Sequence, residues 1–187
     1  IYEDFLSRKG QDLARELDDG AACLAVCGGY QLLGRSYEVY GGKKIPGLGW
    51  MDVWTEAGSM RAIGNILIES TLDGRVVDLA GFENHGGRTF LGEGVTPLGR
   101  VVIGSGNNGQ DGTEGALVKS VVGTYLHGPV LPKNPALTDW LLARSLARRY
   151  SGYVLEPAGS QFEEAAFAEA RQVIIGQRGA RREQFSR

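Results

Sequence analysis

Cysteine and histidine are scarce in this sequence, whose 187 residues include only two of each. Cys23 and Cys27 lie four residues apart, and one continuous strand or helix would keep them from forming a disulfide. This excludes the disulfide framework of a small secreted domain. The four residues also lack the paired spacing of a zinc site. We therefore expect no metal ion, no cofactor and a reducing, cytoplasmic location.

Strong charge and long apolar runs are also absent. The formal net charge is −2, so no overall field attracts nucleic acid, and basic residues gather only at positions 178–187, where a solvated tail is expected. No apolar run is long enough to span a bilayer and no segment resembles a signal peptide, so we expect no membrane insertion. No Gly-x-x-x-x-Gly-Lys-Ser/Thr loop occurs, so we expect ATP to bind elsewhere.

Glycine, by contrast, is abundant. The 29 glycines are about twice the usual share, they are not periodic, and they cluster at turns, which suits a domain with many tight loops around a site. The length fits one domain with a real core. We expect this domain over residues 1–155, followed by a C-terminal helix and a basic tail over residues 156–187.

Hydrophobic patterning predicts an α/β fold with a mixed sheet that is rich in strands after residue 50. Strands are expected at residues 21–26, 51–54, 63–69, 76–79, 101–103 and 121–126. Helices are expected at residues 1–17, 30–37, 134–150 and 161–175. The expected buried faces of the last two helices consist of Leu137, Leu141 and Leu142 or their neighbours, and of Phe162, Ala166 and Val173. Residues 105–115 are polar and rich in Gly, Asn and Asp, which predicts a surface loop.

Cys27 is the residue with the clearest chemical context. It follows the apolar run 21–26 and precedes two glycines and a helical segment, which predicts a strand, a sharp turn and a helix. Small neighbours are required at such a strained turn, which exposes a nucleophile above the sheet edge. The helix N-terminus favours the thiolate, and the backbone N–H of Gly28 is placed to serve as an oxyanion hole. Cys23 is expected to be an inert residue inside the strand.

A cysteine hydrolase also needs a base, and only His85 and His127 are available. His127 follows the run 121–126 and precedes a Gly-Pro turn, so it is expected at a strand end, where ligands of open α/β sheets bind. His85 lies in a loop-like, glycine-rich stretch over residues 81–88, where a structural role is equally compatible with the sequence. We therefore expect His127 to be the base.

Three segments, VCGGYQLLG, GFENHGGRT and GTYLHGP, follow one another in order. Together, over about residues 21–142, they resemble the class I, triad-type glutamine amidotransferases of the cobyric acid synthase branch, and within it most of all the small glutaminase subunits of lipid II isoglutaminyl synthases. The resemblance implies a flavodoxin-like three-layer sandwich with a mostly parallel central sheet and a nucleophile elbow. It also implies a subunit that hydrolyses L-glutamine and supplies ammonia to a Mur-ligase-like synthetase. That partner would hold the ATP site and amidate the D-glutamate of lipid II in peptidoglycan synthesis.

The resemblance also assigns roles to residues. It implies Cys27 as nucleophile and His127 as base, and it implies Arg61 as an anchor for the substrate, since a guanidinium fork suits the α-carboxylate of glutamine. Gln31, in the first segment, is a further substrate-binding candidate. His85 matches a signature position of the family but not the catalytic one.

Two features depart from the family pattern. The family fold begins with a strand–helix–strand portion and a glycine-rich loop that are not present before Ile1, so the chain is expected to be incomplete at its N-terminus. Many class I glutaminases also place a Glu two residues after the histidine, where this sequence has Pro129. A backbone carbonyl or an acidic residue from elsewhere must therefore orient His127, and our hypothesis is an acid from the partner synthetase.

Two alternatives to a peptidoglycan glutaminase remain at this stage. The shared motifs also fit the glutaminase domain of a cobyric or cobyrinic acid synthase in cobalamin synthesis. A protein of another class, an inactive scaffold that only binds a partner, is disfavoured because Cys27 and His127 are both intact. Genome neighbourhood discriminates between the first two readings, and a glutaminase assay tests the third.

Overall fold

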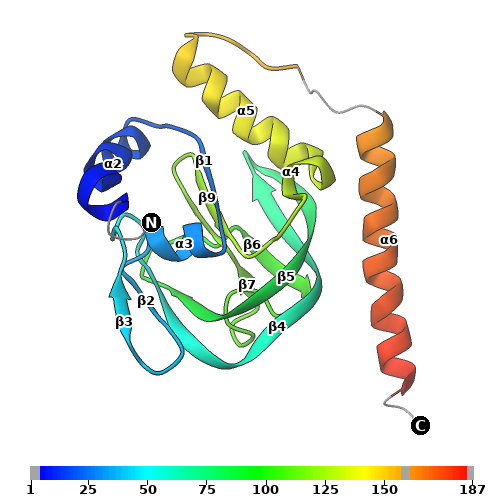
Figure 1. Ribbon diagram of the computed structural model, residues 1–187. Coiled ribbons are helices and arrows are strands. Elements are labelled where there is room, and N and C mark those ends of the chain that lie inside the picture. Colours follow the sequence, from blue (N-terminus) through cyan, green and yellow to red (C-terminus); the bar gives the residue numbers. More distant parts are fainter. Residues whose placement is uncertain (1–4, 157–160, 185–187) are drawn as a thin grey trace.

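The computed structural model describes residues 5–156 and 161–184, with side chains up to residue 176 (Figure 1). Its helical elements are a π-helical segment η1 (Phe5–Lys9), α2 (Gly10–Asp18), α3 (Gly28–Leu33), α4 (Val130–Lys133), α5 (Pro135–Arg149) and α6 (Gln161–Gln184). Its strands are β1 (Cys23–Val26), β2 (Ser36–Glu38), β3 (Lys44–Pro46), β4 (Val53–Leu72), β5 (Arg75–Leu91), β6 (Gly99–Ile103), β7 (Thr113–Glu114), β8 (Ala116–Val118) and β9 (Val121–Thr124).

The strands form two sheets. One has the order β1-β9-β8 and the other the order β3-β2-β4-β6-β7, with β5 paired to β4. Strands β1 and β9 run parallel, with Val26 opposite Thr124, so their carboxyl ends meet at one edge. This pairing brings the residues that follow β1 and β9 to the same edge of the sheet, although about a hundred residues separate them in the sequence.

The α/β class and the mixed sheets agree with the sequence analysis, but most strand pairs are antiparallel. Parallel pairing is confined, in the described residues, to β1 with β9 and β2 with β4. The reason is the long hairpin of β4 and β5, which pairs antiparallel from Val53–Leu91 to Leu72–Arg75. A tight turn at Asp73 and Gly74, both at positive φ, connects these strands, and only antiparallel neighbours can be joined in this way.

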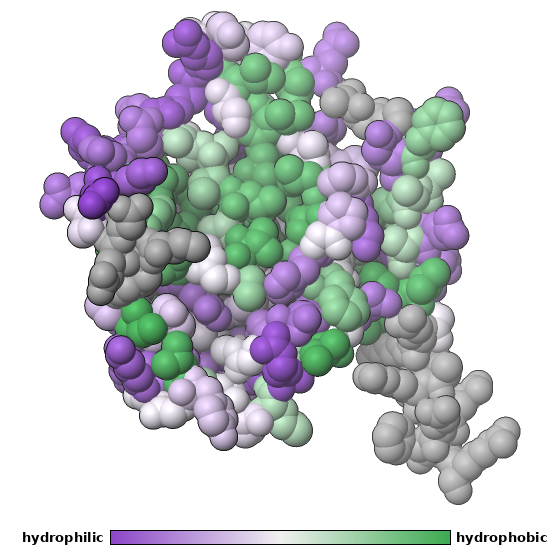
Figure 2. Space-filling view, viewed as in Figure 1, coloured by the Kyte–Doolittle hydropathy of each residue, from purple (hydrophilic) through white to green (hydrophobic). Residues whose placement is uncertain are grey.

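Three groups of buried side chains hold the helices against the sheets. Helix α5 buries Leu137, Trp140 and Leu141 against β4, β5, β6 and β9. Helices α2 and α3 pack over β1 and β9 through Leu17, Tyr30 and Leu33. Figure 2 shows hydrophobic side chains gathered at the centre of the viewed face, between α2, α3 and α5.

The C-terminal helix α6 packs beside β4, β5 and β6. Ile174 is buried against Leu67 and Ala80, with Phe167 beside them, and Arg171 bonds Asp78 at 2.5 Å. The helix is confirmed, but the predicted face is wrong, since Phe162 is 85% and Val173 51% exposed. Phe167 and Ile174, which contact the sheet, lie on another face of the helix. Helix periodicity alone did not identify which face is buried. The expected boundary near residue 155 stays a prediction.

The end of one helix and the cap of another differ from those that the sequence predicts. The helix expected at residues 30–37 ends at Leu33, because the backbone of Gly34 is extended and the chain turns into β2 there. A Cβ at Gly34 would lie 2.8 Å from the Val53 carbonyl oxygen, so the close approach of the two backbones requires glycine. Helix α5 begins at Pro135 as expected. The Asn134 side chain does not cap it and instead bonds the backbone of Ala80 and Val130.

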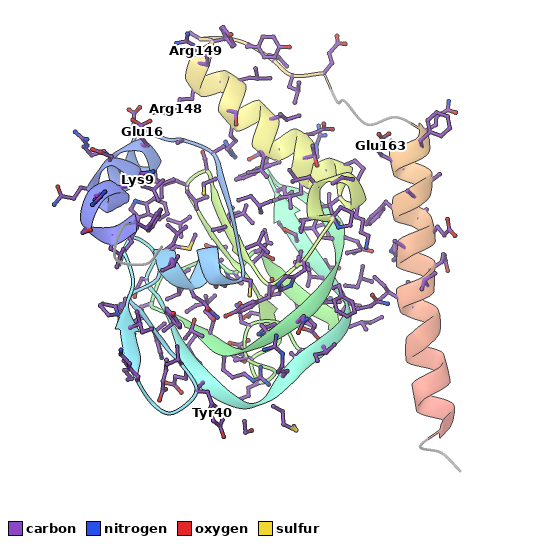
Figure 3. The ribbon with its side chains drawn as sticks, in the orientation of Figure 1. Lys9, Glu16, Tyr40, Arg148, Arg149 and Glu163 are labelled. Atoms are coloured by element: carbon purple, nitrogen blue, oxygen red, sulfur yellow. The ribbon has the colours of Figure 1, made fainter. Side chains whose placement is uncertain are left out.

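Surface ion pairs connect helix α5 to helix α2. Arg148 of α5 reaches Glu16 of α2 and the adjacent Asp19, each at 2.7 Å, as Figure 3 illustrates for the first pair. Exposed pairs of this kind add little stability because solvent screens them, so they orient α2 more than they stabilise the fold. In the part of the chain that the structure describes, every helix is too short or too polar to cross a membrane.

Candidate active site

Cys27 occupies the sharp turn between β1 and α3. Its backbone has φ 52° and ψ −107°, a region that a non-glycine residue adopts only under strain of about 1–3 kcal/mol. The turn is held on both sides, since the Cys27 N–H donates to the Thr124 carbonyl at 2.9 Å and the Cys27 carbonyl accepts from Gln31 N–H at 3.0 Å. A strained residue fixed in this way is typical of a nucleophile elbow.

The electrostatics of Cys27 differ from the sequence expectation. Burial of the side chain raises the pKa of the Cys27 thiol above its ordinary value, while the Gly28 N–H and the positive charge of Arg61 act in the lowering direction. Desolvation is the largest of these influences, and it favours the neutral thiol. The resting residue is thus a thiol, and attack on a substrate requires a base that takes its proton.

His127 lies three residues beyond β9, at the same sheet edge as Cys27. Its backbone N–H donates to the Phe82 carbonyl at 2.9 Å. Its Nδ1 lies 2.8 Å from the Tyr125 carbonyl oxygen and 3.0 Å from that of Phe82. Both partners are acceptors, so Nδ1 carries the proton and Nε2 keeps the lone pair that a base needs. Backbone carbonyls thus orient the ring, the first of the two alternatives that Pro129 raised.

Arg61, near the β-bulge of β4, lies beside this site. Its guanidinium donates to Asn84 Oδ1 at 2.7 Å from Nη2 and at 3.2 Å from Nε, and to the Asn84 carbonyl at 3.0 Å. Its charge acts on both the Cys27 thiol and the His85 imidazole, which places it close to the sheet edge. Asn84 holds the guanidinium without neutralising it, so its charge remains available to an anionic ligand.

Gln31 belongs to a buried polar network that the sequence did not reveal. Its Nε2 donates to the Tyr125 hydroxyl at 3.0 Å, that hydroxyl lies 2.7 Å from Thr89 Oγ1, and Thr89 Oγ1 lies 2.7 Å from Thr55 Oγ1. The network ties α3 to β4, β5 and the segment before His127. The Gln31 amide is committed to Tyr125 here, so its predicted contact with substrate stays a prediction.

His85 is a buried partner of Tyr125. The expected loop around it is wrong, since residues 81–89 lie within β5 and pair with β4. The His85 ring stacks on Tyr125 with centroids 3.7 Å apart, and its Nδ1 bonds the Gly87 carbonyl at 2.9 Å. Burial, the largest influence, lowers the His85 pKa to about 4, so the ring is neutral near pH 7. These contacts give His85 a packing role beside the site.

Among the residues that the structure describes, no three His, Cys, Asp or Glu side chains lie close enough to hold a metal ion. At this sheet edge lie a strained thiol, an imidazole whose Nδ1 is bonded to backbone carbonyls, the Gly28 N–H and the Arg61 guanidinium. This combination is suited to acyl transfer onto sulfur from a substrate with a negatively charged end.

Comparison with known proteins gives a family match and several relatives that agree with this chemistry. A model of the CobB/CobQ-like glutamine amidotransferase domain matches residues 3–135. The subunit GatD of lipid II isoglutaminyl synthase (glutamine-hydrolyzing) from Staphylococcus aureus is 44% identical over 170 residues, 91% of this chain and 66% of the relative. The GatD subunit from Streptococcus pneumoniae is 40% identical over 159 residues, 84% of this chain and 60% of the relative. The chain thus spans slightly less than two thirds of these curated relatives.

A cobyric acid synthase from Pelotomaculum thermopropionicum is 40% identical over 127 residues, which are 61% of this chain and 24% of that protein. Among solved structures, a glutamine amidotransferase from Thermotoga maritima matches with a TM-score of 0.45 and 19% identity, covering 92% of this chain and 65% of that one.

Proposed function

Because the chain belongs to the CobB/CobQ-like glutamine amidotransferase family, we propose that it hydrolyses glutamine, with Cys27 as nucleophile and His127 as the proton-transfer residue. Membership agrees with the resemblance that the three sequence segments indicated and with the class I amidotransferase fold. The observation that carries the proposal is the parallel pairing of β1 and β9, which brings a cysteine at φ 52° and a histidine with a free Nε2 to one sheet edge.

The proposed reaction proceeds through a thioester. Cys27 Sγ attacks the carboxamide carbon of glutamine while its proton passes to His127 Nε2, and the Gly28 N–H donates to the oxyanion that forms. His127 then protonates the departing nitrogen, the carbon–nitrogen bond breaks and ammonia leaves. A water molecule, deprotonated by His127, attacks the thioester carbonyl. The carbon–sulfur bond breaks, glutamate leaves and the thiol regains its proton.

We further propose that the ammonia serves a peptidoglycan ligase in the cytoplasm. The support is that the GatD subunits of lipid II isoglutaminyl synthase match at 44% and 40% identity over 66% and 60% of their own length, whereas the cobyric acid synthases match over 24% and 30% of theirs. The synthetase subunit, Mur-ligase-like in our proposal, would bind ATP and amidate the D-glutamate of lipid II. The second candidate is a cobyric acid synthase glutaminase, supported by matches to such enzymes at 40% identity over 127 residues and at 32% identity over 176 residues.

We predict that Arg61→Ala raises the KM for glutamine about 10- to 100-fold with a smaller effect on kcat, because a lost charge-assisted hydrogen bond costs about 1.5–3 kcal/mol. The reason is that the guanidinium is held by Asn84 in an orientation where it can receive the α-carboxylate. Steady-state kinetics with glutamine measure the effect. Arg100→Ala is the control, since Arg100 forms an exposed pair with Glu69. An unchanged KM in Arg61→Ala would refute the role.

We also predict that the protein hydrolyses glutamine at least about tenfold faster with its synthetase than alone, within the range that general acid–base groups contribute. Two neutral carbonyls hold His127 Nδ1, and they stabilise an imidazolium less than a carboxylate does. An acid from the docked synthetase would add that stabilisation. Ammonia release from glutamine is measured with and without the partner. In a second assay, lipid II and a cobyrinate are compared as acceptors of the ammonia. Equal rates would contradict the predicted dependence, and amidation of a cobyrinate would favour the second candidate.

A further inference from the structure

The segment between β9 and His127 is held by side chains instead of a neighbouring strand. Strand β9 ends at Thr124. The N–H of Tyr125 donates to Glu114 Oε1 at 2.7 Å, and the N–H of Leu126 donates to Thr124 Oγ1 at 3.0 Å. The Thr124 hydroxyl itself donates to the same Glu114 oxygen at 2.6 Å. One buried carboxylate therefore fixes the backbone that carries His127.

These bonds form an unbroken chain from the carboxylate to the imidazole. Glu114 accepts from the Thr124 hydroxyl, whose oxygen accepts from the N–H of Leu126. That N–H belongs to the same peptide group as the Tyr125 carbonyl, which accepts from His127 Nδ1 at 2.8 Å. We propose that Glu114 is a positioning residue for His127, acting through Thr124 and this peptide group.

The physical basis is cooperative polarisation. A carboxylate that accepts from a hydroxyl makes the hydroxyl oxygen a stronger acceptor, which polarises the next amide and strengthens its carbonyl as an acceptor. The Tyr125 carbonyl then holds the proton on Nδ1 more firmly and stabilises the imidazolium that forms during proton transfer. An acid in direct contact with the histidine has these two roles in a triad. The proposal thus deepens the proposed glutaminase activity and rests on it for its catalytic consequence.

The surroundings of Glu114 support a role for its charge. The side chain is fully buried, and its Oε2 has no hydrogen-bond partner among the described residues. Burial, the largest influence, raises the Glu114 pKa to about 7, with Glu83 on β5 contributing in the same direction and the Thr124 and Tyr125 donors opposing it. The ring of Tyr30, on α3, also lies within its electrostatic reach. Glu114 is therefore fully ionised only above about pH 7, where its hydrogen-bond chain to His127 starts from a carboxylate.

Glu83 provides the matched comparison. It is almost as buried as Glu114, at 3% exposed, but its carboxylate accepts from the N–H groups of Ser105 and Gly106 in the loop after β6. It is close enough to influence Glu114 electrostatically, so its removal also takes a buried carboxyl group from this region. It is not a member of the hydrogen-bond chain to His127. Comparing the two residues separates an effect through the chain from an effect of buried charge in general.

The test uses nuclear magnetic resonance of the full protein labelled with ¹⁵N-histidine. Only two histidines exist, so His85→Asn assigns both signals. We expect a wild-type His127 ring with the proton on Nδ1 and a strongly downfield Hδ1 resonance. Glu114→Gln and Thr124→Val should move Hδ1 upfield and populate the Nε2–H tautomer. Thr124→Ser, which keeps the hydroxyl, and Glu83→Gln should resemble wild type. This readout does not depend on glutamine hydrolysis, so it can fail or succeed separately from the proposed function.

Kinetics of the same variants with the synthetase bound supply the second readout. Glu114→Gln and Thr124→Val should each lower kcat about 10- to 100-fold, part of the range that general base catalysis supplies, with KM for glutamine nearly unchanged. The double variant should be no slower than the more affected single one, since both break one chain. Wild-type tautomer and Hδ1 shift in both Glu114→Gln and Thr124→Val would overturn the proposal, as would equal effects of Thr124→Ser and Thr124→Val. Thermal unfolding verifies folding, and the Thr124 pair remains decisive should Glu114→Gln not fold.

Discussion

Replacement of Cys27 by alanine is expected to reduce ammonia release from glutamine to below about 1% of the wild-type rate, because loss of a nucleophile removes the covalent route entirely. Cys27→Ser should be nearly as inactive, since a hydroxyl is a far weaker acid and a weaker nucleophile than a thiol in the same position. The fold should survive both changes, because the side chain is only half-buried and the turn is held by backbone bonds to Thr124 and Gln31.

Cys23→Ala is the matched control for this prediction. Cys23 lies at the start of β1, opposite Val121 of β9, and packs among apolar neighbours of α2 and α3. Burial raises its pKa, which keeps it a thiol, and its backbone has no strain of the kind seen at Cys27. Its removal should leave kcat within about twofold and cost only packing energy. If Cys27→Ala retained several per cent of the activity while Cys23→Ala lost its activity, the assignment of Cys27 as nucleophile would be wrong.

His127→Asn is expected to lower kcat about 10²- to 10⁴-fold, the usual contribution of a general acid–base residue. Because burial raises the pKa of the Cys27 thiol, the reaction depends on transfer of its proton, and His127 Nε2 is the group at that sheet edge able to receive it. Asparagine keeps a hydrogen-bonding side chain but has no basic nitrogen.

His85→Asn should show the opposite pattern of effects. Its neutral ring stacks on Tyr125, and an aromatic pair of this kind contributes about 0.5–1.5 kcal/mol beyond its area, so thermal stability should fall. Catalysis should fall much less than in His127→Asn. Glutamine kinetics and thermal unfolding of the two variants are compared side by side. A dead His85→Asn beside an active His127→Asn would reverse the assignment of the base.

The sequence predicted the parts of the site whose signals are local. Cys27 could be placed at an elbow because an apolar run precedes it and two glycines follow it. His127 could be placed at a strand end for a similar reason, and a parallel pair of strands then brings the two together. Arg61 came from family resemblance alone, and the structure adds that Asn84 holds its guanidinium.

Other features depended on contacts that no local pattern encodes. The glycine-rich stretch around His85 was expected to be a loop, yet it is a strand because the long β4 supplies hydrogen-bond partners along its whole length. Glu114 lies in a stretch expected to be a polar loop, and only tertiary structure shows that it is buried and bonded to Thr124 and Tyr125. Buried polar networks of this type join residues that are distant in sequence, so they are found from coordinates.

The most direct test of the account is covalent capture of the nucleophile. The protein, bound to its synthetase, is treated with a diazoketone analogue of glutamine, which alkylates an attacking thiolate, and the modified peptide is identified by mass spectrometry. We expect one adduct, on Cys27, whose formation is suppressed by glutamine and slowed in His127→Asn. An adduct on Cys23, or no cysteine adduct while ammonia is still released from glutamine, would contradict it.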